Sequence, residues 1–82
     1  MLLLATYASS QGALQAERML KAAGLQLELI PVPRQVKSSC GFGLLAEVQD
    51  DGHLLRESGA EGLWRAHEPE PGQRRRTYEP YL

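Results

Sequence analysis

The stretch Leu2–Ile30, "LLLATYASSQGALQAERMLKAAGLQLELI", contains the pattern of a strand, a helix and a second strand in succession. Leu2–Tyr7 is a continuous apolar run that ends in small polar residues, which is typical of a central strand buried on both faces. Across Gln11–Ala23 apolar residues recur at helical spacing, and Gly24 follows as a stop signal. Leu25–Ile30 alternates apolar and polar residues, which predicts a half-exposed edge strand.

Two further elements follow in the middle of the chain. Phe42–Val48 places alternate apolar side chains on one face and predicts a third strand. Residues 50–59 admit two interpretations: a short helix capped by Asp50, or a hairpin turn at Asp51–Gly52. We favour the helix, because it continues the succession of strands and helices.

Leu63–His67 predicts the last core strand, with Trp64 large enough to anchor one end of the core. Residues 69–82, "PEPGQRRRTYEPYL", form a Pro- and Arg-rich extension that is either a tail or an added edge strand. The order β-α-β-β-α-β within residues 1–68 predicts a single α+β domain of the ferredoxin-like, split β-α-β type. We expect a four-stranded sheet with two helices on one face.

Composition narrows the classes of function. The 82 residues allow one domain, and a formal net charge of −1 argues against nucleic acid as a partner. No apolar run approaches the roughly 20 residues of a membrane span, so no membrane association is expected. The apolar opening lacks the basic start of a signal peptide, and a small secreted domain would usually need disulfides. We therefore expect a cytoplasmic protein.

The segment Pro31–Gly41, "PVPRQVKSSCG", carries Cys40, the only cysteine of the sequence. Arg34 and Lys37 precede Cys40, and no acidic residue lies within the segment. The reactive form of cysteine is the thiolate, which neighbouring Lys and Arg side chains favour. The segment therefore predicts an exposed, reactive thiol, with Arg34 and Lys37 as its charged companions. The alternative is that Cys40 is a small buried residue without a chemical role.

The residues next to the cysteine suit the same interpretation. Hydroxyls of Ser38 and Ser39 can donate hydrogen bonds to a thiolate, and Gly41 lets the backbone approach closely or adopt a positive φ. We expect these three residues to form the binding part of the site. A single thiol has no resolving partner, so dithiol chemistry is excluded. One cysteine and two scattered histidines show no metal-ligand spacing, and we expect neither a metal nor a cofactor.

Three motifs together resemble the small proteins described as selenium/sulfur carrier-like. They are the helix core Ala13–Glu17, "ALQAE", the strand end Ile30–Arg34, "IPVPR", and the turn Ser38–Gly41, "SSCG". The resemblance covers about residues 2–48. It implies that Cys40 is the carrier thiol and that Arg34 is its companion.

The resemblance implies a carrier rather than an enzyme. Cys40 would accept a persulfide or selenide from a donor of the cysteine-desulfurase type and pass it to an acceptor protein. The alternative hypothesis is a regulatory or protein-interaction module of the same fold, in which Cys40 is incidental and edge strands mediate docking or a homodimer.

Overall fold

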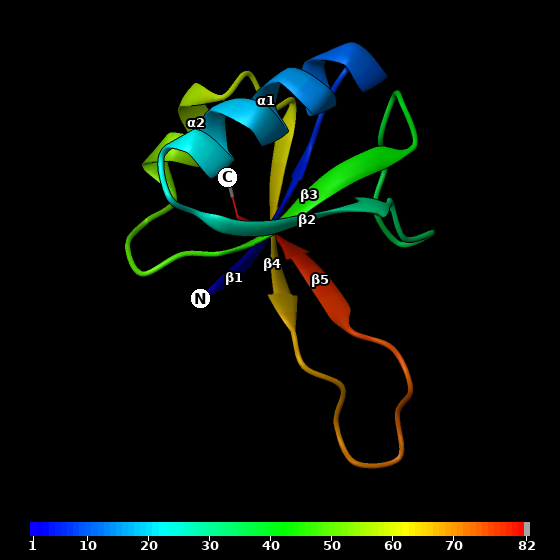
Figure 1. The fold of residues 1–82 in the computed structure, drawn as a ribbon. Coiled ribbons are helices and arrows are strands. Elements are labelled where there is room, and N and C mark those ends of the chain that lie inside the picture. The colour runs from blue at the N-terminus through cyan, green and yellow to red at the C-terminus, as the bar shows by residue number, and fades with distance from the viewer. Residues whose placement is uncertain (82) are drawn as a thin grey trace.

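The computed structural model describes residues 1–81, and Leu82, the last residue of the predicted extension, lies outside the described part. Five strands form one antiparallel sheet in the order β2-β3-β1-β4-β5. Figure 1 shows α1 and α2 on one side of this sheet and the β4–β5 hairpin extending away from them. The elements are β1 (Leu2–Thr6), α1 (Ser10–Ala22), β2 (Gln26–Pro31), β3 (Phe42–Glu47), α2 (His53–Glu57), β4 (Gly62–His67) and β5 (Thr77–Pro80).

The mixed α+β class with two helices is confirmed, but the expected sheet of four strands is wrong. Thr77–Pro80 forms β5, which pairs with β4 in the register Trp64↔Pro80 to His67↔Thr77. The backbone N–H of Tyr81 then donates to Leu63 O (2.9 Å), and the Arg56 guanidinium lies 5.8 Å from the centre of the Tyr81 ring. Tyr81 is thereby joined to both the sheet and α2.

The main core lies between the helices and one face of the sheet. Ala13, Ala16 and Leu20 of α1 are buried there, as their helical spacing predicts. Small alanines let the helix approach the sheet closely, and the Ser9 side chain begins the helix by accepting from Gly12 N–H (3.1 Å). The sheet, the residues that directly follow β1 and β3, and α2 contribute the other large buried side chains, Leu3, Tyr7, Leu44, Val48, Leu55 and Leu63.

The opposite face of the sheet, here called the second face, is also covered. Strand alternation places Leu4 of β1 on this face, and Leu4 has no exposed surface. A Cβ added at Gly43 would lie 3.0 Å from Leu4 Cδ1 and 3.3 Å from Val32 Cγ2, so these two side chains meet over Gly43. Val36 is buried as well (5% exposed). The segment after β2 therefore covers part of the second face.

Trp64 does not anchor the main core. It pairs with Leu4, whereas the adjacent pair Ala5↔Leu63 points toward the helices, so Trp64 lies on the second face. Its indole Nε1 is buried and has no hydrogen-bond partner among the described residues. The sequence suggested a core position because size and hydrophobicity do not reveal which face of a strand a side chain occupies.

The helical interpretation of residues 50–59 is confirmed, with a different start. Gly52 is the N-cap of α2, with φ +76°, and Asp50 stands two residues earlier, where its side chain accepts from Gly52 N–H (2.8 Å). Glycine suits this left-handed backbone because it has no Cβ. Among residues 1–81, no helix combines the length and apolar character that a membrane crossing demands.

Replacing Gly52 should therefore destabilise the fold by two routes. A positive φ costs a non-glycine residue roughly 1–2 kcal/mol. In Gly52→Ala the new Cβ would also lie 2.6 Å from Cδ1 of the fully buried Leu3, and overpacking adds about 1–3 kcal/mol. Gly59→Ala is the matched control, because Gly59 has φ +87° and nothing within 4 Å of the added Cβ. Urea unfolding should show a larger loss for Gly52→Ala; equal losses would contradict the packing argument.

Tyr7 places an ionisable group in the main core. Burial raises the pKa of Tyr7, and a hydrogen bond with Ser58 opposes this shift. The two oxygens lie 2.8 Å apart, and Ser58 Oγ also donates to Leu55 O (2.6 Å). Because the Ser58 hydroxyl has one proton, Tyr7 must donate to Ser58 Oγ. The neutral phenol is thus the form that the fold accommodates.

The free energy of unfolding should consequently fall as the pH rises above 10.0, the ordinary pKa of tyrosine. Above that pH the unfolded chain loses the Tyr7 proton while the folded chain keeps it, so the unfolded state is favoured. Tyr7→Phe should be less stable at neutral pH, by about 1 kcal/mol for the lost hydrogen bond. Denaturant unfolding between neutral and alkaline pH should also show a shallower decline for the variant than for the wild type. Parallel declines would contradict the assignment.

Candidate functional site

The segment Val32–Gly41, here called the thiol loop, joins β2 to β3 and contains the sequence-predicted site. Pairing of β2 with β3 reaches Pro31↔Phe42, and Val32 N–H donates to Gly41 O (2.9 Å) to close the base of the loop. Within the loop, Val36 N–H donates to Pro33 O (3.0 Å) and forms a turn. Gly41 has φ +81°, a backbone conformation that favours glycine directly after the cysteine.

Glu61 connects the thiol loop to the start of β4. Its two carboxylate oxygens accept from Ser39, one from the backbone N–H (2.9 Å) and one from the hydroxyl (3.0 Å). Glu61 is itself held to the end of β1, because its N–H donates to Thr6 O (2.7 Å). The residue before Cys40 is therefore bound by a carboxylate that follows it by 22 positions in sequence.

Cys40 is half-buried and packs against the main core. Its sulfur lies 3.3 Å from Phe42 O and 3.5 Å from Phe42 N. A protonated thiol can donate to this carbonyl, and a thiolate can accept from this N–H, so the Phe42 backbone serves both forms. The Ser38 hydroxyl accepts from Cys40 N–H (3.4 Å) and hence faces the cysteine backbone. Phe42 itself is 44% exposed.

The two predicted basic companions lie in different hollows on either side of the loop. Lys37 lines a hollow of about 370 Å³ together with Ser38, Ser39 and Glu61. Trp64 also contributes to the wall of this hollow. Arg34 lines another, together with arginines of the β4–β5 hairpin. Neither Arg34 nor Lys37 forms an ion pair within residues 1–81, and the hydrogen bonds of the Cys40 sulfur go to Phe42.

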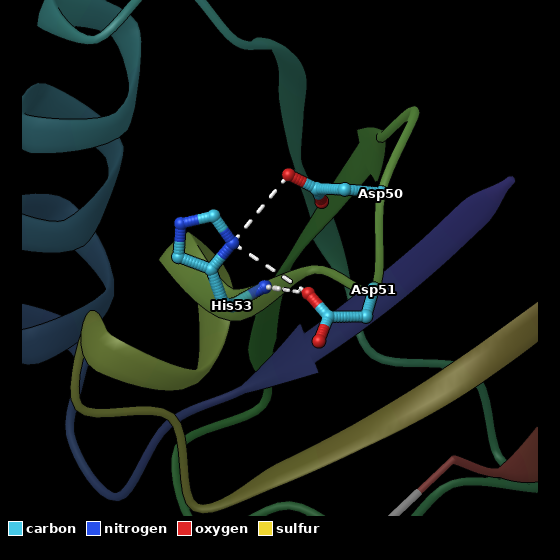
Figure 2. Close-up of side chains that lie close together, drawn as sticks. All are labelled: Asp50, Asp51 and His53. Carbon is cyan, nitrogen blue, oxygen red and sulfur yellow. Dashed lines mark hydrogen bonds and ion pairs between the residues drawn. The ribbon is translucent and has the colours of Figure 1, made fainter.

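A second cluster of ligand-type side chains lies at the start of α2, at a different point in the fold (Figure 2). Nδ1 of His53 is 3.4 Å from Asp50 Oδ2 and 3.5 Å from Asp51 Oδ1, and all three side chains are exposed. Asp51 also accepts from His53 N–H (3.2 Å). These hydrogen bonds start the helix and account for the positions of both aspartates. Sequence reasoning missed this grouping, although the spacing Asp-Asp-Gly-His was visible.

A comparison with protein families bears directly on the thiol loop. The family model described as "Putative Se/S carrier protein-like" matches residues 2–63, a span that includes the whole loop. The chain belongs to this family. The suspected resemblance is thereby confirmed, and the match runs from β1 to the first residues of β4. No curated protein and no solved structure matches the chain.

For this Se/S carrier-like chain, Glu61 is the site residue that sequence reasoning missed. In sequence, the first acidic residues before and after the loop are Glu28 and Glu47, so the sequence presented the loop as purely basic. Glu61 reaches Ser39 only because β4 pairs with β1 and β1 pairs with β3. No local sequence signal marks such a contact, since it depends on the order of strands in the sheet.

Removing the Glu61 carboxylate should loosen the turn that carries Cys40. In Glu61→Ala the Ser39 N–H loses its acceptor, so its amide hydrogen should exchange about three- to tenfold faster with solvent. Glu57→Ala is the control, because Glu57 is exposed on α2 and makes no hydrogen bond to the loop. Amide exchange followed by NMR tests this directly. If the Ser39 amide exchanges at the wild-type rate in Glu61→Ala, the carboxylate does not hold the loop.

Proposed function

We propose that the protein is a sulfur or selenium carrier that uses Cys40 as its thiol. The observation that carries the proposal is that the sole cysteine lies in the anchored Ser-Ser-Cys-Gly turn, inside the span that the family model matches. The family description supports a carrier role and thus a non-enzymatic function. A single unpaired thiol also suits a reducing, cytoplasmic compartment.

The proposed transfer needs only one thiol and no net change in oxidation state. The Cys40 thiolate attacks the terminal sulfur of a persulfide on a donor of the cysteine-desulfurase type. The sulfur–sulfur bond of the donor breaks, a new one forms on Cys40, and the donor cysteine leaves as a thiolate. An acceptor nucleophile then takes the terminal atom from Cys40 in the same way. In a selenium carrier, a selenium atom takes the place of the transferred sulfur atom, and the steps are the same.

The surroundings of the sulfur suggest roles for the neighbouring residues. Phe42 N–H, 3.5 Å from the sulfur, would stabilise the thiolate and the departing anion. Gly41 and the Glu61–Ser39 link would hold the turn in place while donor and acceptor exchange. Lys37 and Ser38, which line the hollow beside the turn, would contact the incoming partner. Arg34 lies near the start of the loop, lines a different hollow, and would act on the partner rather than on the thiol.

Intact-mass spectrometry after incubation with a cysteine desulfurase, its cofactor and cysteine tests the carrier function. Wild-type protein should gain the mass of one sulfur atom, and dithiothreitol should remove it, because a persulfide is reducible. Cys40→Ser should gain nothing. Phe42→Ala keeps the backbone groups that face the sulfur and should still be loaded. No gain in the wild type, or an equal gain in Cys40→Ser, would refute the proposal.

One observation favours the alternative of an interaction module. The Cys40 sulfur is half-buried, packs on the core and bonds to Phe42 O, as a structural cysteine would. In that case the free edge of β2 would provide the docking surface or a homodimer contact. The mass measurement separates the two functions.

We also retain the ferredoxin-like interpretation of the core. Without β5, the strand order is β2-β3-β1-β4, and α1 and α2 each connect strands that are not neighbours in the sheet. This order supports a split β-α-β sandwich that has been extended by one edge strand.

A further inference from the structure

A basic cleft of about 450 Å³ lies between the thiol loop and the β4–β5 hairpin. Arg34 from the loop and Arg75 and Arg76 from the hairpin line it. Gln35 Nε2 donates to Arg76 O (3.2 Å), which joins the two walls. Segments about 40 positions apart in sequence thus bring three arginines to one cleft, here called the arginine cleft.

The charges of the arginine cleft are poorly compensated. Arg34 and Arg75 are exposed and form no ion pair among the described residues, whereas Arg76 pairs with Glu68. The chain has ten acidic residues, yet no Asp or Glu in its described part lines the cleft. Because the net charge of the molecule is −1, this positive surface reflects a local segregation of charge.

The remaining walls of the arginine cleft are apolar and stiff. Pro31 and Pro33 border it on the loop side, and the half-buried Tyr78 of β5 borders it on the sheet side. Proline fixes the backbone and tyrosine has few rotatable bonds, so little conformational entropy is lost when a peptide packs against them. The proline and tyrosine side chains offer apolar contact to the backbone of a bound peptide. The arginines can form bidentate hydrogen bonds with its carboxylates.

We propose that the arginine cleft docks a short acidic segment of a partner protein. Guanidinium groups bind carboxylates through paired hydrogen bonds, and uncompensated charge accelerates encounter with an oppositely charged partner. The occupant is short because Glu68 and the exposed Glu70 flank the arginines in the hairpin, and a long polyanion would meet them. A single aromatic side chain gives little stacking surface for unpaired bases, so a peptide is favoured over RNA.

The arginine cleft and Cys40 belong to the same loop, which gives the docked partner a place in the proposed function. Only the role of the partner rests on the proposed function: the partner would be the protein that gives sulfur or selenium to Cys40 or takes it away. Binding of the acidic segment needs no thiol. Cys40→Ser should therefore bind as the wild type does, and a failure of the carrier chemistry would leave the docking result standing.

The test is an NMR titration of ¹⁵N-labelled protein with an octaglutamate peptide at low ionic strength. Saturable shifts should centre on residues 30–36 and 75–78, and added salt should weaken them. Arg34→Gln/Arg75→Gln should bind about tenfold more weakly, through the loss of two charge-assisted contacts. Arg18→Gln/Arg65→Gln is the matched control, because both arginines are exposed, lie outside the cleft and change the net charge equally.

Three results would overturn the proposal. The first is an absence of saturable shifts at the cleft. The second is an equal loss of affinity in the control variant, which would mean that only net charge matters. The third is tighter binding of an oligouridylate than of octaglutamate at the same residues, which would identify a nucleic-acid surface instead. A glycine–serine peptide of equal length should cause no saturable shift.

Discussion

Burial of β1 on both faces is the constraint on which the rest of the structure depends. The strand is paired with β3 on one side and with β4 on the other, and Leu3, Leu4 and Ala5 have no exposed surface. Two helices cover the face that carries Leu3 and Ala5. Residues 1–81 contain no third helix for Leu4, and the segment after β2 covers part of the other face instead.

This constraint explains why the thiol loop is ordered. Val32 contributes to the cover of the second face, Val36 is buried, and Gln35 joins the loop to the hairpin. The polar residues of the loop are therefore held at defined positions, and Glu61 fixes Ser39. The thiol loop is thus part of the packed structure rather than a mobile connection. Its cysteine packs against the main core.

The same arrangement separates two basic residues, Arg34 and Lys37, that are close together in the sequence. Arg34 and Lys37 are three positions apart, yet they line different hollows, because the chain turns between them and buries Val36. Arg34 instead joins Arg75 and Arg76, which belong to the extension that the sequence left open as a tail or an added edge strand. The surroundings of Cys40 are correspondingly dominated by backbone groups of Phe42 rather than by side-chain charge.

The sequence by itself determined the local elements. Apolar periodicity identified β1 to β4 and α1, the succession of strands and helices favoured the short α2, and the loop motif indicated the family, because these signals are carried by residues close together in the chain. The tertiary structure alone decided the pairing of β5 with β4, the face occupied by Trp64, the Glu61–Ser39 link and the arginine cleft. These features depend on strand order and register, which bring distant residues together through packing that no local pattern encodes.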